Sequence, residues 1–168
     1  MKIKLFSILA FVAISLTASA QDLKTFDGKL FTCQYPANFE AQEQWMDEAF
    51  NAKIEDAVEF LSVSVNDQEM SDEWLKEWCE GMRGLTETSF GEPTGWKAGP
   101  VQVKGKMAFF RCEGEESVNG DPVPAVKFIG GLSTPDKKFF VVELRFGKND
   151  EAKYKPLFDK IISTAKAK

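Results

Sequence analysis

The sequence predicts a single α+β domain over residues 21–168, built on a mainly antiparallel sheet of about six strands with helices packed on its faces. Three observations predict this class. The 168 residues are 43% hydrophobic and include 15 Phe, a composition rich enough for a packed core and too apolar for disorder. Runs of alternating polar and apolar residues, typical of strands, fill the second half of the chain between short turns. Two segments, after Ser71 and at the carboxyl end, instead space their apolar residues as helices do.

The first elements expected after residue 21 are strands. Residues 30–35 alternate between two faces and stop at Pro36, and Asp27-Gly28 before them predicts a hairpin turn from a short strand over 24–26. Residues 48–55 also alternate, but a helix over 41–53 competes with a strand there. Residues 57–65 form a β-branched run, which predicts a strand.

A helix is expected to begin at Ser71, whose hydroxyl can cap free backbone N–H groups ahead of two acidic residues. Gly81 and Gly84 weaken its last turns and indicate an end near there. Its apolar stripe is expected to lie on a sheet and contains Leu75, Cys79 and Met82, widened by Trp74, Trp78 and Leu85. A loop over 91–100, rich in Gly and Pro, then links the two halves of the domain.

The second half is expected to be a meander closed by a helix. Asn119-Gly120 between alternating runs is a strong hairpin signal, and a second turn lies at Thr134-Pro135-Asp136. Pro156 fits best in the first turn of the last helix, which makes residues 150–153 a separate turn or a kinked lead-in. The expected strands cover 101–104, 106–116, 125–132 and 138–146, and the helical stripe is Leu157, Phe158, Ile161, Ile162 and Ala165.

Residues 1–20 have the pattern of a secretory signal peptide. A basic start precedes an apolar run over 5–16, and small residues match the site that signal peptidase cleaves, between Ala20 and Gln21. The alternative, a membrane anchor, is disfavoured because the run is shorter than the ~20 apolar residues needed to span a bilayer. A lipoprotein would need Cys directly after cleavage, and the first Cys is Cys33. We therefore expect an exported, soluble protein, periplasmic or extracellular, with no lipid anchor and no stable membrane insertion.

Charge and composition exclude several classes of function. Cleavage would remove Lys2 and Lys4 and leave 19 basic against 26 acidic side chains, so the surface repels nucleic-acid phosphates and anionic lipid headgroups. The chain has no His, so it cannot supply a Ser-His-Asp or Cys-His arrangement, an HExxH zinc site or an imidazole base. No motif indicates a cofactor or a metal site. A segment over 99–106 has a near match to a phosphate-binding loop, but its spacing is too long and Met107 replaces the Ser or Thr.

Several short motifs together resemble the PsbP-like family of small α/β/α sandwiches. They are Asp27-Gly28-x-x-Phe31 with Tyr35-Pro36-x-x-Phe39, then Val101-x-Val103-x-Gly105, then Phe158-x-x-Ile161-Ile162. The family includes the extrinsic subunit of the photosynthetic oxygen-evolving complex, the Ran-binding Mog protein and many bacterial envelope proteins. The resemblance implies that sandwich fold and an accessory or binding role rather than catalysis. A cystatin-like helix-on-sheet fold is the alternative.

Three classes of function stay open. The first is a non-catalytic binding or accessory protein of the bacterial envelope, with a protein or a small ligand as its partner and no cofactor. The second is a carboxylate-based hydrolase, because Glu113 and Glu115 share a strand face and could take part in an acid/base pair. The third is a structural subunit of an envelope assembly.

Two further expectations concern particular side chains. Cys33 and Cys112 both lie in expected strands and could form a disulfide in an oxidising compartment, the alternative being three buried free thiols. Trp96, followed by Lys97, stands among Gly and Pro where no periodicity asks for an aromatic residue. A binding loop is one explanation for it, and a Trp that folds back to cover the end of the sandwich is the other.

Overall fold

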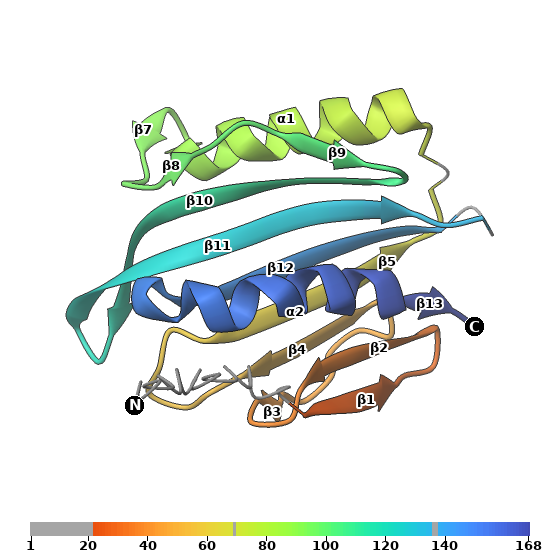
Figure 1. The fold of residues 1–168 in the computed structure, drawn as a ribbon, viewed down its shortest axis with the longest axis horizontal. Coiled ribbons are helices and arrows are strands. Elements are labelled where there is room, and N and C mark those ends of the chain that lie inside the picture. The colour runs from red at the N-terminus through yellow and green to blue at the C-terminus, as the bar shows by residue number, and fades with distance from the viewer. Residues whose placement is uncertain (1–21, 69, 136–137) are drawn as a thin grey trace, which may run out of the picture.

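A computed structural model describes residues 22–68, 70–135 and 138–168 (Figure 1). The signal peptide expected over 1–20 and its cleavage site at Ala20 and Gln21 lie outside the described residues. An antiparallel sheet of eight strands forms the centre of the fold. Its strands, in spatial order, are β3 (Glu40–Ala41), β4 (Ala49–Lys53), β5 (Phe60–Asn66), β12 (Phe139–Gly147), β11 (Asp121–Ser133), β10 (Met107–Val118) and β8 (Lys97–Ala98), with β9 (Gln102–Lys104) also paired to β10.

The expected count of about six strands is therefore too low. The prediction missed β3 and β8, which are two residues long and too short to show alternation. Residues 49–53 form β4, so the strand alternative is confirmed there and the helix over 41–53 is wrong. The turn at Asn119-Gly120 is confirmed: both residues have positive φ, 54° and 93°, as a two-residue hairpin turn requires.

Two smaller sheets complete the strand structure. The first consists of β1 (Leu23–Asp27), β2 (Phe31–Pro36) and β13 (Lys166–Ala167), and it contains the hairpin expected at Asp27-Gly28. In that turn the N–H of Gly28 donates to the carbonyl of Phe31 at 3.0 Å. The second is a short hairpin of β6 (Thr88–Ser89) and β7 (Glu92–Pro93).

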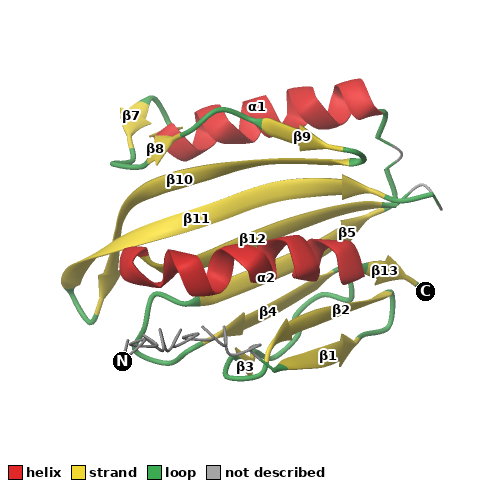
Figure 2. Cartoon of the chain, in the orientation of Figure 1, coloured by secondary structure: helices red, strands yellow, loops and turns green. Residues whose placement is uncertain are grey.

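Helices α1 (Asp72–Glu87) and α2 (Glu151–Thr164) pack on opposite faces of the main sheet and run roughly along its strands (Figure 2). Alternation along β10 shows the two faces: Met107 and Phe109 face α2, whereas Phe110 and Cys112 face α1. Helices on both faces exclude the cystatin-like alternative. No helix of the described chain is long and apolar enough to cross a membrane.

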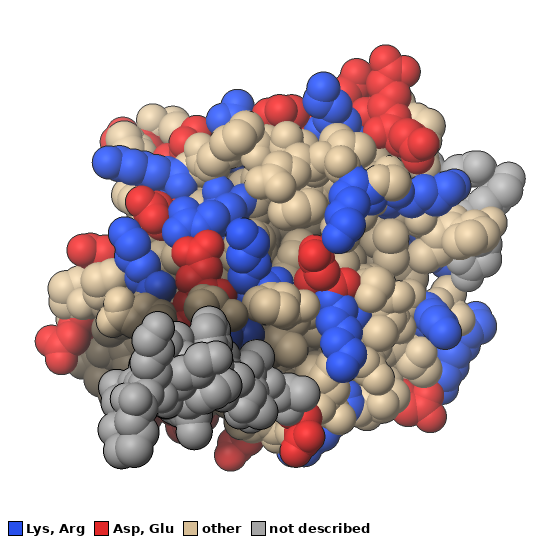
Figure 3. Space-filling model, viewed as in Figure 1, with Lys and Arg blue, Asp and Glu red and all other residues tan. Residues whose placement is uncertain are grey.

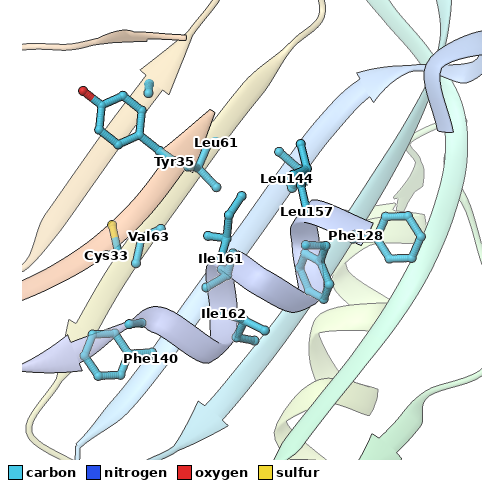
Figure 4. Packing of buried hydrophobic residues seen from close by; sticks show 14 of the residues in the cluster. Cys33, Tyr35, Leu61, Val63, Phe128, Phe140, Leu144, Leu157, Ile161 and Ile162 are labelled. Atoms are coloured by element: carbon cyan, nitrogen blue, oxygen red, sulfur yellow. The ribbon is translucent and has the colours of Figure 1, made fainter. Parts of the chain in front are cut away.

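The side chains between α2, the β1–β2 hairpin and the sheet form the larger core, which we call the α2-side core. Leu157, Ile161 and Ile162 of α2 point toward residues of the sheet (Figure 4). The smaller α1-side core contains Met70, Leu75, Cys79, Ala108, Phe110, Cys112, Ile129 and Phe139.

Two adjacent glycines of β11 let both helices approach the sheet closely. A Cβ on Gly130 would lie 3.0 Å from Cζ of Phe158 in α2, and a Cβ on Gly131 would lie 2.8 Å from Cδ1 of Leu75 in α1. The added atoms would also lie 2.7 Å from Cβ of Phe109 and 2.6 Å from Cε2 of Phe139, so a larger residue at either position would clash with a helix and with a neighbouring strand.

Both helices begin or end differently from the prediction. α1 continues past Gly81 and Gly84 to Glu87, so the expected end near these glycines is wrong by about one turn. α2 begins at Glu151, directly after a 3₁₀ turn over 148–150, which places Pro156 inside the helix rather than in its first turn. Tyr154 is fully buried and stacks on Phe146 with ring centroids 5.2 Å apart, which anchors the turn before the proline.

Candidate functional site

The candidate site is an open cleft of about 600 Å³ between the loop before β8 and the far ends of β10 and β11. We call it the β10 cleft. It brings together Lys97 of the expected recognition loop and Glu113 and Glu115, the two carboxylates considered for acid/base chemistry. Its lining residues are Thr94, Gly95, Lys97, Glu113, Gly114, Glu115, Pro124 and Lys148.

The loop that carries Lys97 is fixed to the end of α1. The backbone N–H of Thr94 donates to the carbonyl of Glu87 at 2.9 Å, and the Thr94 hydroxyl donates to the same carbonyl at 3.1 Å. The Glu87 carboxylate in turn accepts the N–H of Ala98 at 3.0 Å. β8 pairs with β10 so that Lys97 lies opposite Glu113. This wall of the cleft is therefore held against the end of α1 by hydrogen bonds. The same bonds satisfy a backbone carbonyl that the end of the helix would otherwise leave without a partner.

Trp96 is half-buried and does not line the cleft. It lies flat over Gly114, where an added Cβ would be 2.9 Å from Cδ2 of the indole. The ammonium of Lys127 lies over the ring, 3.9 Å from its centroid. The ring therefore folds back onto the sheet, in the manner of the second explanation given above, and only Lys97 of the pair faces the cleft.

Ion pairs along one side of the cleft fix its charges. The guanidinium of Arg111 makes two hydrogen bonds to the Glu151 carboxylate, at 2.8 and 2.7 Å, and also donates to Glu113 at 3.1 Å. The ammonium of Lys148 is 3.5 Å from the same oxygen of Glu113. On the face that carries α2, acidic and basic side chains lie next to one another rather than in separate fields (Figure 3).

These pairs determine the protonation of the carboxylates. The hydrogen bond from Arg111, with the positive charge of Lys148, lowers the pKa of Glu113. The hydrogen bond from Arg111 likewise lowers the pKa of Glu151 against a smaller opposing effect of burial, and the two carboxylates raise the pKa of Arg111. A general acid at neutral pH needs a raised carboxyl pKa. Glu113 is shifted in the opposite direction, so it is an ionised hydrogen-bond acceptor.

A second charged group lies on the α1 side of the sheet, next to Trp96. Glu116 pairs with Lys127 at 3.1 Å and also with Arg145, whose guanidinium lies 5.0 Å from the centroid of Phe60. Burial favours the neutral form of Glu116, but the hydrogen bond and charge of Arg145, with those of Lys127, outweigh it and lower its pKa. The group therefore places paired charges on the α1 side of the sheet, next to Trp96.

All three cysteines are buried free thiols. Cys33 lies in the α2-side core, whereas Cys79 and Cys112 lie in the α1-side core. The possible disulfide between Cys33 and Cys112 is not formed, because their side chains are on opposite sides of the main sheet, and the alternative of three buried free thiols is the one observed. Burial raises the pKa of each thiol to about 12, so none of them is a reactive thiolate at neutral pH.

The sequence interpretation missed exposed aromatic residues. Trp74 was expected in the apolar stripe that lies on the sheet, but it is 57% exposed, and Trp45 is 89% exposed. Phe90, at the tip of the β6–β7 hairpin, is fully exposed and has a φ of 52°. The position of Trp74 at the edge of the helical stripe was the only signal for this. Among residues 22–68, 70–135 and 138–168, no three His, Cys, Asp or Glu side chains come together as metal ligands would.

Helices on both faces of an antiparallel sheet, with a small second sheet against one of them, define a Mog-like fold. The chain is similar to the Ran-binding protein Mog1p of Saccharomyces cerevisiae, with 12% identity over 88% of this chain and 96% of that one and a TM-score of 0.55. It is also similar to a protein of Bacteroides thetaiotaomicron, with 12% identity over 85% of this chain and 49% of that one and a TM-score of 0.51. The resemblance stated from the sequence is thereby confirmed at the level of the fold.

A third similar structure is the cyanobacterial PsbP of Synechocystis, with 11% identity over 88% of this chain and 94% of that one and a TM-score of 0.49. No family model and no curated protein matches the sequence.

Proposed function

We propose that this protein is a secreted, non-catalytic binding or accessory protein of the bacterial envelope, and that the β10 cleft contacts its partner. The fixed ion pairs of the cleft carry the proposal. Glu113 is held in place by Arg111 and by Lys148, and its pKa is lowered. Such groups recognise charges on a partner without exchanging protons. The signal-peptide pattern of residues 1–20 supports the location.

The charges of the cleft suit a polar polypeptide segment. Lys97 and Lys148 stand beside Glu113 and Glu115 in the same cleft. A partner segment with acidic and basic side chains in matching positions satisfies both signs. The fold is compatible with this role, because a protein with a similar structure is described as Ran-binding.

A pull-down tests the proposal. The bait is a tagged protein comprising residues 21–168, and the source is an envelope extract. The double variant Lys97→Glu/Lys148→Glu reverses two cleft charges and should lose at least nine-tenths of the retained partner, whereas Lys160→Glu on the exposed face of α2 should retain it. A wild-type bait that retains nothing, or a cleft variant that retains as much as the control, contradicts the proposal.

The hydrolase alternative keeps one supporting observation: Glu113 and Glu115 do line a common cleft. A screen with glycoside, ester and peptide substrates separates it from binding. Turnover by the wild type that is abolished in Glu113→Gln or Glu115→Gln would replace the binding proposal. A partner that is retained at a fixed stoichiometry and in several copies would instead support a structural subunit.

A further inference from the structure

Helix α1 has an apolar stripe that the protein itself does not cover. Trp74 is 57% exposed and Leu85 is 67% exposed. At about 100° per residue, four positions of the helix fall within an arc of about 60°: Trp74, Trp78, Gly81 and Leu85. A Cβ on Gly81 would meet no atom within 4 Å, so the middle of the stripe is open. Exposed contiguous apolar surface of this kind marks an interaction site.

The stripe faces one particular part of the sheet. The ring of Trp78 contacts Phe139 of β12, with centroids 4.9 Å apart and an edge-to-face geometry. Glu87, at the opposite edge of the helix, accepts a hydrogen bond from the backbone of Ala98 in β8. In the sheet β12 and β8 lie on opposite sides of β11 and β10. The stripe therefore faces β12, β5 and β4.

That part of the sheet is open on the α1 side. α1 packs on β10, β11 and β8, and no other helix or strand of the described chain packs over β12, β5 and β4 on this side. The side chains that point there are half-buried and mix apolar with polar groups: Val141, Glu143 and Arg145 of β12, Phe60, Ser62 and Ser64 of β5, and Asn51 of β4. We call the helix stripe and this open sheet face together the α1 surface. A second helix beside α1 would complete the layer that covers this face.

Charge identifies the kind of occupant. Glu73 and Glu77 lie along the outer edge of the stripe, and Glu143 lies on the open sheet face. None of these three carboxylates forms an ion pair with another described residue. Acidic groups thus border the apolar residues on both sides. A second copy of the chain, with a net charge of −5, and an anionic lipid surface would both be repelled by these carboxylates.

We propose that the α1 surface docks an amphipathic, basic helix of a partner protein. Its apolar face packs on Trp74, Trp78 and Leu85, and its Lys or Arg side chains pair with Glu73, Glu77 and Glu143. This is the helix-in-groove mode of recognition, in which apolar anchors repeat every three or four residues. The site is separate from the β10 cleft, so the two can be tested independently.

Site-specific photocrosslinking tests the proposal. A benzophenone amino acid replaces Leu85 in the tagged protein, and in the control protein it replaces Met46, which is 62% exposed on the loop between β3 and β4. After irradiation in an envelope extract, mass spectrometry identifies the crosslinked peptide. Position 85 should label, at least fivefold above position 46, a segment with apolar residues at helical spacing and flanking Lys or Arg. A crosslink to a second copy, to lipid or to an acidic segment, or equal yields at the two positions, would overturn the proposal.

Matched surface variants provide the second measurement. Trp74→Ser/Leu85→Ser removes two exposed anchors, and Trp45→Ser/Met46→Ser removes two exposed apolar residues elsewhere, so both variants should fold, as far-ultraviolet circular dichroism would verify. In the pull-down, the first variant should retain at least tenfold less partner than the wild type and the second should retain as much as the wild type. Full retention by Trp74→Ser/Leu85→Ser with loss in the cleft variant would overturn this inference and leave the proposed function intact. If only the α1-surface variant lost the partner, the partner would bind at the α1 surface and not at the β10 cleft.

Discussion

Arg111 is the residue on which the charges of the β10 cleft depend, because Glu113 and Glu151 both pair with it. The folded-state pKa of Glu151 is lowered, so its ion pair stabilises the fold above the unfolded pKa of about 4.3, and that stabilisation is lost as the pH falls through the folded pKa. We expect Glu151→Gln to lower the free energy of unfolding by about 1 kcal/mol at pH 7. Chemical denaturation at several pH values should show the difference from wild type shrinking below about pH 4. The control Glu43→Gln, at an exposed position, should change the free energy of unfolding at pH 7 by less than about 0.5 kcal/mol, and a Glu151→Gln effect that persists at pH 2.5 would contradict the assignment.

The three thiols give a second prediction at the scale of single residues. Burial raises the pKa of each to about 12, so the native protein should react with none of its thiols over minutes at pH 8. After denaturation without reductant, titration with a chromogenic disulfide should find three thiols. A count of one would indicate a disulfide and would contradict the assignment of three free thiols.

Trp96 gives a third prediction at the scale of single residues. Its indole fills the space above Gly114 and lies under the ammonium of Lys127. Trp96→Ala should therefore cost about 2 kcal/mol of unfolding free energy, less than a fully buried aromatic residue because the ring is only half-buried. Gly114→Ala should displace the ring and increase its quenching by iodide in a variant that keeps Trp96 as the only Trp. Trp45→Ala, at an 89% exposed position, should change stability by less than about 0.5 kcal/mol, and an equal effect of the two Trp variants would contradict the placement.

At the scale of elements, α1 keeps its last turn although two glycines precede it. Thr94 donates to the carbonyls of Thr86 and Glu87, so tertiary contacts hold the turn that local propensity disfavours. An added Cβ on Gly84 would meet no atom within 4 Å, and the position has no positive φ. We expect Gly84→Ala to raise the free energy of unfolding by about 0.5 to 1 kcal/mol, since it removes backbone entropy from the unfolded chain. Thermal and urea melts measure this, and a destabilised variant would show that the last turn is not helical in solution.

The elements that could be predicted from the sequence are those with a local signal. The hairpin at Asn119-Gly120 has the residues its φ angles require, and the β-branched run over 57–65 overlaps β5 over residues 60–65. The cleft had no such signal, because Lys97 reaches Glu113 through the pairing of β8 with β10. A two-residue strand in a Gly-rich loop shows neither alternation nor register.

The exposure of this face of α1 could not be predicted from the sequence, for a related reason. Apolar spacing predicted that Trp74 and Leu85 widen the buried stripe, but the pattern does not show how wide the covering sheet is. Only the docking of α1 over β10 and β11, away from β5 and β4, leaves this edge uncovered. Likewise, Gly130 and Gly131 appear in the sequence as ordinary strand glycines, and their role as contact points for two helices depends on the packing.

At the scale of the whole molecule, the two cores share three strands. β10, β11 and β12 place alternate side chains in the α1-side and α2-side cores. The adjacent residues Gly130 and Gly131 also contact α2 and α1, respectively, so the two helices pack on neighbouring residues of one strand. Separate unfolding of either layer would leave one apolar face of the same strands in water. The domain should therefore unfold as one cooperative unit.

Leu75→Ala and Ile161→Ala test this, because each truncates a fully buried side chain in a different core. Each should lower the free energy of unfolding by about 2 to 5 kcal/mol. The effects should add to within about 0.5 kcal/mol in the double variant, because the two side chains lie on opposite sides of the sheet. Urea unfolding should be followed by fluorescence, to which Trp78 and Trp96 of the α1 side contribute, and by far-ultraviolet circular dichroism, which reports all helices and strands. Coincident transitions in both single variants support one unit, whereas an early fluorescence transition confined to Leu75→Ala would show that α1 detaches while the rest of the sandwich stays folded.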